Sequence, residues 1–355
     1  MIDDNIAETA AFFWSLKDSD ADDTRLEIDR FDEMSRFNFA ALHSNQLAAI
    51  LDANPRRQFE LQNGTWSAEQ AVILATRPFS VKLKLSDSPL SVMESRFRFR
   101  DKGAAFVNAL EKRNSSFGSL ALSFLNTTDI PFSVPNMERL LKCQFDKLEI
   151  GVMHQDLALL PFASNTAALD YKIDSDNFDS RDFYSLQIVA KDIHLTVVVN
   201  GDRDDYWNWD KLLIAFLNRV AQLGHLERLG VSARYWHEDQ EGWARYKTKR
   251  VALVAEALVD AIRANPKLSC LDLSDTESIV KWGPHLEIIR KAIENHEASP
   301  TFLVRGDDSS NSVYSSDDYD SEDDFSNSDN EEGDDDIDSD GGDLNSSDDE
   351  EDDDD

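Results

Sequence analysis

The residue types that most often carry catalysis or bind metals are dispersed along this chain of 355 residues. No histidine lies at metal-ligand spacing from another histidine or from a cysteine, and the run His237-Glu238-Asp239 is interpreted as a solvated loop. The sequence also lacks a phosphate-binding loop, a dinucleotide glycine motif and a nucleophile elbow. We therefore expect no catalytic residue, no cofactor and no metal. A protein that is not an enzyme is expected, and an α/β enzyme with an unrecognised site is the catalytic alternative.

One acidic stretch is close to a calcium-binding loop. Aspartates alternate from Asp336 to Asp340 ahead of Gly341, but the twelfth position holds Ser347 where such loops need a bidentate glutamate. Neither flank has a helical pattern. We predict diffuse cation binding there rather than a structured calcium site.

Two other stretches have the composition of a binding surface. The first, residues 234–250, interleaves aromatic and basic side chains, a combination that is frequent in protein interfaces. Its candidate partner-binding residues are Tyr235, Trp236, Trp243, Arg245 and Tyr246. The alternative is an extended amphipathic helix whose aromatic side chains join the core and whose cations are solvated.

The second stretch is Ser-Arg-Phe-Arg-Phe-Arg at residues 95–100. As a strand it would place Arg96, Arg98 and Arg100 on one side and two phenylalanines on the other. We consider a binding role for these three arginines, with an edge strand protected by charge as the alternative.

The elements that would position these residues follow from short alternating apolar runs, which predict half-buried strands. The eight intervals between the first and last strand centres, residues 59 and 302, average about 30 residues. The predicted centres are Phe59, Leu83, Leu120, Leu148, Leu169, Leu195, Leu229, Leu271 and Phe302.

Helical spacing appears between these runs, for example at Val251, Val254, Leu258 and Ile262. Ala-Asn-Pro, at 53–55 and again at 264–266, is expected to end a helix, because the residue before proline avoids helical angles. The predicted helix caps are Ser44 or Asn45, Asp101, Asn136 and Asp205.

The strands also predict which side chains point away from the helices. Lys82 and Lys84 are expected to face Glu60 across neighbouring strands. Because both signs of charge occur there, we expect a surface for a protein partner and no direct binding of nucleic acid. The outward residues are Gln58, Glu60, Lys82, Lys84, Lys147, Glu149, Asp170, Lys172 and Asp272.

The segment Asn-Pro-Lys-Leu-Ser-Cys-Leu-Asp-Leu-Ser-Asp-Thr, 265–276, resembles the leucine-rich repeat consensus, and the helix before it resembles the ribonuclease-inhibitor subclass. Thr276 stands where that consensus usually has Asn or Cys. The resemblance implies an α/β fold, an irregular leucine-rich-repeat-like solenoid with a parallel sheet on the concave side and helices outside. A doubly wound α/β domain is the alternative, but no Val/Ile-rich set of central strands and no glycine-rich first turn support it.

The charge divides the chain into a foldable body and a polyanionic tail. Residues 306–355 hold 25 of the 70 acidic residues and none of the 36 basic ones, which leaves a net charge of −9 on the rest. We predict a cap region over 1–44, the repeats over 45–305 and a disordered acidic tail over 306–355. The tail's candidate phosphorylation sites, each three residues before an acid, are Ser315, Ser321, Ser326, Ser328, Ser346 and Ser347.

Repeats followed by an acidic tail are similar in layout to the acidic leucine-rich nuclear phosphoproteins, which bind histones. They are also similar in layout to the GTPase-activating protein of the Ran nuclear-transport GTPase. We expect a non-enzymatic interaction scaffold with a protein partner on the repeats and a basic partner, such as a histone-like polycation, on the tail; a GTPase regulator is the alternative.

The cellular compartment is inferred from what the sequence contains. Cys143 and Cys270 each lie in an apolar run and are predicted to be buried free thiols in a reducing compartment. The N-terminus does not have the pattern of a secretory signal, and no apolar run approaches membrane-spanning length. A cytoplasmic or nuclear protein with no membrane partner is expected.

Overall fold

The computed structural model divides the chain into two units, residues 1–306 and 307–355. It describes residues 39–53, 58–62, 64–77, 79–87, 96–124, 131–199, 208–235, 248–275 and 278–304, all of which belong to the first unit. Most of the predicted cap region and the whole acidic tail lie outside the described residues.

Nine strands of the described residues form one sheet, and two more form a small sheet beside it. The strands of the large sheet are β1 (Phe59–Gln62), β3 (Phe79–Ser86), β5 (Gly118–Ser123), β6 (Phe145–Ile150), β7 (Thr166–Asp174), β8 (Asp192–Val199), β9 (Arg228–Tyr235), β10 (Cys270–Leu273) and β11 (Thr301–Val304). The small sheet pairs β2 (Thr65–Trp66) with β4 (Arg98–Phe99).

Helices or short 3-10 turns connect the strands. The α-helices are α2 (Ser44–Ala53), α3 (Ala68–Thr76), α4 (Ala104–Glu111), α5 (Val134–Leu141), α6 (Trp209–Leu223), α7 (Thr248–Ala264) and α8 (Leu286–Glu294). The 3-10 turns are η2 (Phe39–Ala41), η4 (Gln155–Leu157), η5 (Leu160–Ala163), η6 (Ser175–Asn177), η7 (Ser180–Ser185) and η9 (Gly283–His285).

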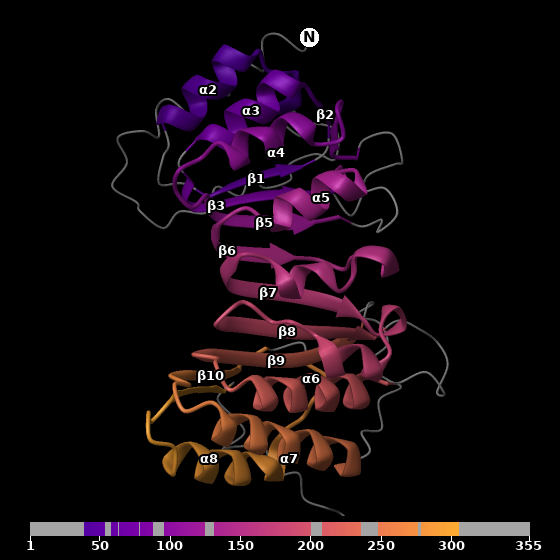
Figure 1. The fold of residues 1–355 in the computed structure, drawn as a ribbon, viewed down its shortest axis with the longest axis vertical. Coiled ribbons are helices and arrows are strands. Elements are labelled where there is room, and N and C mark those ends of the chain that lie inside the picture. Colours follow the sequence, from indigo (N-terminus) through magenta and orange to yellow (C-terminus); the bar gives the residue numbers. More distant parts are fainter. Residues whose placement is uncertain are drawn as a thin grey trace, which may run out of the picture. The chain divides into compact units, whose positions relative to one another are not determined.

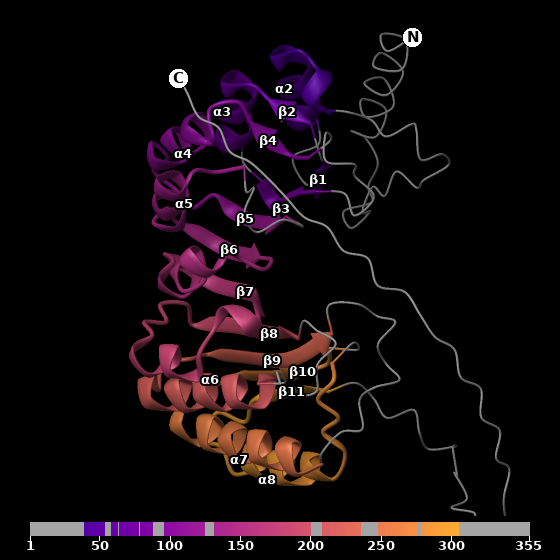
Figure 2. The same ribbon diagram turned by 90° about the vertical axis from the view of Figure 1, so that its right-hand side faces the viewer.

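The nine strands pair in the order of the sequence, and every pairing among them is parallel. The described helices lie along one side of this sheet (Figures 1 and 2). The predicted α/β fold with a parallel sheet is therefore confirmed. In a doubly wound domain, the strand order reverses within the sheet and helices cover both of its faces. The described strands keep the order of the sequence, and the described helices lie on one side (Figure 2).

The predicted strand centres form one continuous row across the sheet. Phe59, Leu83, Leu120, Leu148 and Leu169 are consecutive register partners, and Leu229, Leu271 and Phe302 continue the same row. Leu195 lies at the middle of β8, as predicted, although Ile193 is the residue of β8 that belongs to this row. Strand β8 is apolar at four successive alternate positions, so its sequence alone did not reveal which of them is in register with the neighbouring strands.

Between β7 and β8, where only 3-10 turns connect the strands, an aromatic cluster fills the core. Phe162 lies edge-on to Tyr171 at 5.2 Å and also contacts Phe183 and Phe216. The buried Tyr171 hydroxyl donates a hydrogen bond of 2.7 Å to the carbonyl of Ala158. Large rings thus occupy the volume that α-helices occupy elsewhere.

The helix ends agree with the predicted caps only in part. The N-cap residue of α4 is Gly103 and not Asp101, although the Asp101 carboxylate accepts hydrogen bonds from the backbone N–H groups of Gly103 and Ala105. Asn136 is not a cap: α5 begins at Val134, and Ser133 caps it, because the hydroxyl is correctly placed to accept from the Asn136 N–H. Ser44 already belongs to α2. Asp205 lies outside the described residues.

The second Ala-Asn-Pro ends α7 as predicted, and Asn265 has a further role. Its buried side chain donates to the carbonyl of Ala261 at 2.8 Å and accepts from the backbone N–H of Leu226 at 2.9 Å. The backbone carbonyl of Asn265 contacts the Nε2 atom of the buried His296 at 3.0 Å. One residue therefore joins the end of α7 to the start of β9 and to the turn after α8.

We expect Asn265→Ala to lower the free energy of unfolding by about 1–3 kcal/mol, because it leaves buried backbone groups without a partner. Urea titration followed by circular dichroism measures this change. The control is Asn295→Ala, since Asn295 is exposed and bonds only within its own helix end; a change of about 0.5 kcal/mol or less is expected there. Equal losses in the two variants would contradict the role given to Asn265.

Candidate protein-binding surface

The side of the sheet turned away from the helices, here called the open face, presents the alternate side chains of each strand. The register places one row of these positions across the sheet, one residue after the row of apolar centres. From β1 to β10 that row is Glu60, Lys84, Ala121, Glu149, Asp170, His194, Gly230 and Asp272.

Lysines of β3 are bound by carboxylates on two different strands. The Lys84 Nζ atom lies 2.7 Å from Glu60 on β1, as predicted. Lys82 does not pair with Glu60; it binds Glu149 on β6, across the intervening β5. The reason is that β5 has only the short side chains of Ser119, Ala121 and Ser123 at its outward positions, so the long lysine side chain passes over this strand.

Glu149 is the centre of this group because it holds two lysines. Its Oε1 atom lies 3.0 Å from the Nζ atom of Lys147, which also approaches Asp170 at 3.9 Å. Burial raises the pKa of the Glu149 carboxyl, but hydrogen bonds from Lys82 and Lys147 lower it more, so its pKa lies below the usual value. For Lys147, burial lowers the pKa, and Glu149, Asp170 and Asp192 raise it to a net value above its usual range.

A second charged group lies on β8 and β9. The Asp192 carboxylate forms an ion pair with Arg228, whose Nε atom lies 3.3 Å away. The pKa of Asp192 is nevertheless raised, because burial and the charge of Asp170 outweigh the effects of Arg228, Lys147 and His194. The cations near Asp192 therefore offset only part of the effect of burial on its pKa.

Gly230 leaves room for the imidazole of His194. A Cβ atom at residue 230 would lie only 2.6 Å from the His194 Nδ1 atom, so the ring covers the bare backbone of β9. Further along the same strands, the buried hydroxyls of Ser232 and Thr196 are hydrogen-bonded at 3.0 Å. The open face of β8 and β9 is thus occupied by small polar groups whose positions are determined by packing.

The sequence analysis did not identify Asp192, His194 and Arg228, or the buried Thr196, as residues of this side of the sheet. The alternation at Ile193, Leu195, Val197 and Val199 contained the necessary signal, because the residues between them must point to the opposite side.

The stretch 234–250 is described only at its two ends: 234–235 belong to β9, and 248–250 begin α7, where Arg250 lies 3.7 Å from Asp210. Tyr235 is half-buried at the end of β9 and packs against the core, as the alternative interpretation expected for the aromatic residues. The other candidates, Trp236, Trp243, Arg245 and Tyr246, lie outside the described residues.

The arginines of residues 95–100 lie where the alternation placed them. Phe97 and Phe99 are buried, whereas Arg98 and Arg100 are exposed and Arg96 is half-buried. The strand β4 belongs to the small sheet near β3, and β9 lies five strands further along the large sheet. Among the described candidates, Tyr235 on β9 and the arginines in and beside β4 therefore lie on different sheets.

The two cysteines differ in burial. Cys270 is buried on β10, as predicted, but Cys143 is only half-buried after α5, where its Sγ atom lies 3.5 Å from the carbonyl of Arg139. Burial raises the pKa of the Cys143 thiol to about 11, which disfavours the reactive thiolate.

Within the described ranges, no three or more His, Cys, Asp and Glu side chains are arranged to hold a metal ion. None of the described helices has the length and hydrophobicity to cross a membrane.

No family model, no curated protein and no solved structure matches this chain. The likeness to leucine-rich repeats therefore stays a prediction.

Glu149→Gln is expected to lower the free energy of unfolding at pH 7 by about 1–2 kcal/mol, since two lysines lose a charged acceptor. The pKa of Glu149 is depressed in the folded state, so its stabilisation is present above the ordinary value of 4.5 and is lost as the pH falls through the folded pKa. The difference between wild type and variant should consequently shrink at pH 3. Urea titrations at both pH values measure it.

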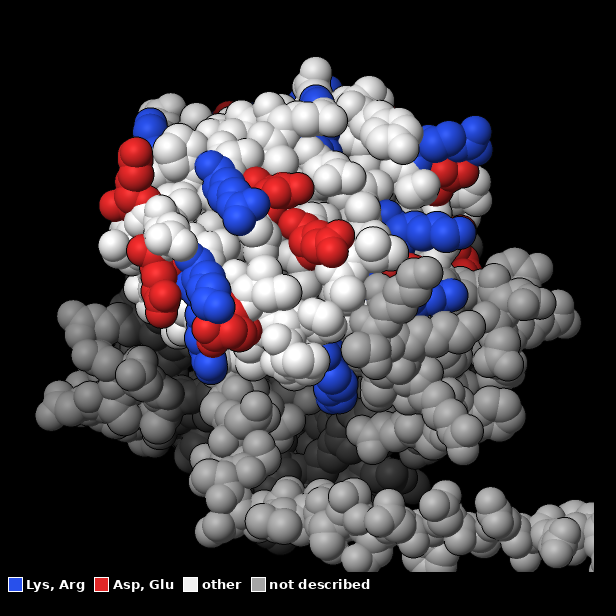
Figure 3. Space-filling model, turned by 90° about the horizontal axis from the view of Figure 1, so that it is seen from below, with Lys and Arg blue, Asp and Glu red and all other residues white. Residues whose placement is uncertain are grey.

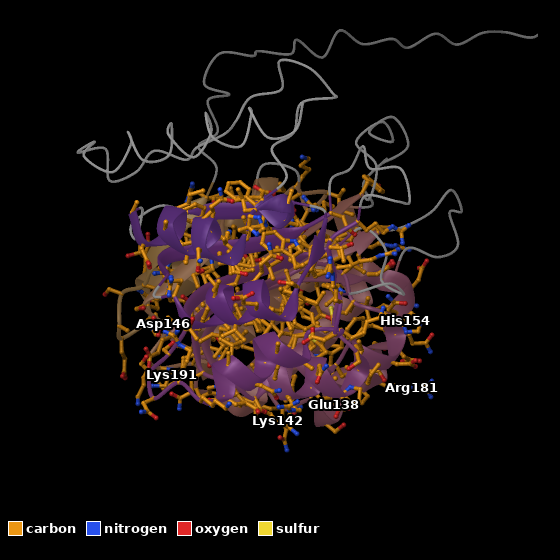
Figure 4. The ribbon with its side chains drawn as sticks, turned by 90° about the horizontal axis from the view of Figure 1, so that it is seen from above. Glu138, Lys142, Asp146, His154, Arg181 and Lys191 are labelled. Carbon is orange, nitrogen blue, oxygen red and sulfur yellow. The ribbon has the colours of Figure 1, made fainter. Side chains whose placement is uncertain are left out.

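The matched control is Glu138→Gln, which changes an exposed carboxylate on the helix side. Figure 4 labels Glu138 and Lys142 on that side, Asp146 and Lys191 at the starts of strands, and His154 and Arg181 at the opposite ends. A pH-independent difference for Glu149→Gln, or an equal effect in the control, would show that the ion pairs of Glu149 contribute nothing.

Proposed function

We propose that this chain is a non-enzymatic interaction scaffold: a leucine-rich-repeat-like solenoid that binds a protein partner on its open face and a basic partner through its acidic tail. The observation that carries the first part is the group around Glu149. Its side chain is 23% exposed, and Lys82 and Lys84 are 21% and 28% exposed. Charges held this firmly lose little freedom when a partner binds.

The solenoid interpretation is supported by the strand order. A helix-strand unit cannot bury its apolar side alone, so repeated units stack on their neighbours. Strands that pair in sequence order, with connecting helices on one side, are what such stacking requires. The open face is then a broad surface that runs across many repeats.

The charge pattern of this surface favours a protein over a nucleic acid. Nucleic acid binds a positively charged surface, because lysine and arginine side chains neutralise its phosphates. On the open face, Lys82, Lys84 and Lys147 alternate with Glu60 and Glu149. Alternating signs match a protein surface in a defined register, which gives specificity more than affinity.

The acidic tail would act differently. Its 25 carboxylates over 50 residues attract polycations within about one Debye length, roughly 8 Å at physiological salt. A histone-like protein has the required density of positive charge. Phosphorylation of the six candidate serines would add about −1.5 to −2 charges at each site and strengthen this attraction.

Reversing one charge of the open face tests the first part. We expect Asp170→Lys to reduce capture of a protein partner from lysate about tenfold or more, because it replaces the carboxylate beside Lys147 with a second cation. Glu138→Lys, the same kind of change on the helix side, should capture the partner as wild type does. Quantitative mass spectrometry of the captured proteins measures both. Equal loss in the two variants, or no loss in either, would contradict binding through the open face.

Removing residues 306–355 tests the second part. The full chain should bind histones with an affinity that falls steeply between 50 and 300 mM salt, and the truncated chain should lose this binding. Fluorescence anisotropy with labelled histone at several salt concentrations measures the difference. Equal binding by the truncated chain would refute the role of the tail.

A further inference from the structure

The two edge strands of the large sheet differ in how well their apolar side chains are buried. At the first end, the apolar residues of β1 are covered: Phe59 and Leu61 are 5% and 0% exposed. At the last end, Phe302 of β11 is only half-buried and Leu303 is 39% exposed. Among the described residues, β11 pairs with β10 alone. A stack of repeats needs a cover at each end, and the described part of the chain supplies none at β11.

Strand β11 has the features of an edge that accepts another strand. Its four residues, Thr-Phe-Leu-Val, carry no charge. In natural proteins, a lysine, a proline or a bulge in an edge strand usually prevents that strand from pairing with another chain. Strand β11 contains none of these.

The segment that follows β11 is poorly suited to cover it. Residues 306–355 contain 25 acidic residues and only six apolar or aromatic ones. A strand drawn from this segment would place carboxylates against Leu303 and desolvate them without a partner cation. A second copy of the chain instead supplies the same uncharged strand.

The backbone of β11 determines how two copies would pair. The Thr301 N–H donates to the carbonyl of Ser269, 2.8 Å away, beside β10. Because successive residues of a strand direct their N–H and C=O groups to opposite edges, Phe302 directs both of its groups to the free edge. In an antiparallel pair with a two-fold axis at Phe302, the two copies of Phe302 would exchange both hydrogen bonds.

That register also matches the side chains. Residues opposite each other in an antiparallel pair lie on the same side of the sheet. Thr301 would therefore face Leu303 of the other copy on the open face, and the two copies of Phe302 would meet on the helix side, where each is half-buried. We propose that two copies of this chain associate through β11 in this antiparallel register and form one continuous sheet.

The surface around α8 is compatible with such a two-fold contact. Figure 3 views this end of the sheet and shows acidic and basic side chains interspersed with uncharged ones. Lys291 lies 3.4 Å from Glu287 on the outer side of α8. A two-fold axis brings a surface against itself, and a surface of mixed sign allows this without a large repulsion.

The test compares two double variants of the full chain that differ in one charge. In the proposed register, Thr301→Lys with Leu303→Lys places cations opposite each other across the axis and should weaken the dimer. Thr301→Glu with Leu303→Lys places opposite charges there and should bind about tenfold more tightly than the double-lysine variant. Sedimentation velocity from about 1 to 100 µM measures the dissociation constants.

Wild type should sediment as a dimer in this range. Leu253→Lys, a similar change at an exposed leucine of α7, is the control and should leave association unchanged. Thermal unfolding followed by circular dichroism verifies that each variant is folded. Wild type that stays monomeric at the highest concentration would overturn the proposal and leave the edge to a different protein. Equal association of the two double variants would overturn the register.

Discussion

The row of apolar side chains from Phe59 to Phe302 is the interaction on which the rest of the structure depends. Each member is the register partner of the next, and the row faces the helices along the whole sheet. A single strand and its connecting segment could not bury these side chains, because each needs a neighbour on both sides. Stability therefore comes from the repetition of one contact, and local connections are free to vary between α-helices and 3-10 turns.

Once this row faces the helices, the composition of the open face follows from strand alternation. The short side chains on this face then determine which charged side chains can contact each other. Because β5 has only short outward side chains, those of Ser119, Ala121 and Ser123, Lys82 reaches past it to Glu149. Because β9 has Gly230, His194 lies over its backbone.

The sequence allowed the strand row, the end of α7 and the pairing of Lys84 with Glu60 to be predicted, since each depends on residues close in sequence or in register. It did not allow the partner of Lys82 to be predicted, because that choice depends on what the strand between leaves open. The cap of α5 was placed at Asn136 where Ser133 acts, because both residue types cap helices and only the backbone distinguishes them. That Ile193 is the residue of β8 in the apolar row was not predicted either, because an unbroken alternation contains no internal mark of register.

The body and the tail would respond differently to salt, which separates the two parts of the proposed function. The ion pairs around Glu149 are short, half-buried and already compensated, so dissolved ions screen them weakly. The carboxylates of residues 306–355 have no compensating cation within the segment, and attraction by the tail depends on their sum. Contacts of the first kind select a partner by the position of each charge, whereas the second kind attracts any dense polycation. A chain with both can recognise one protein by its surface pattern and concentrate a basic protein nearby, and salt would release the second before the first.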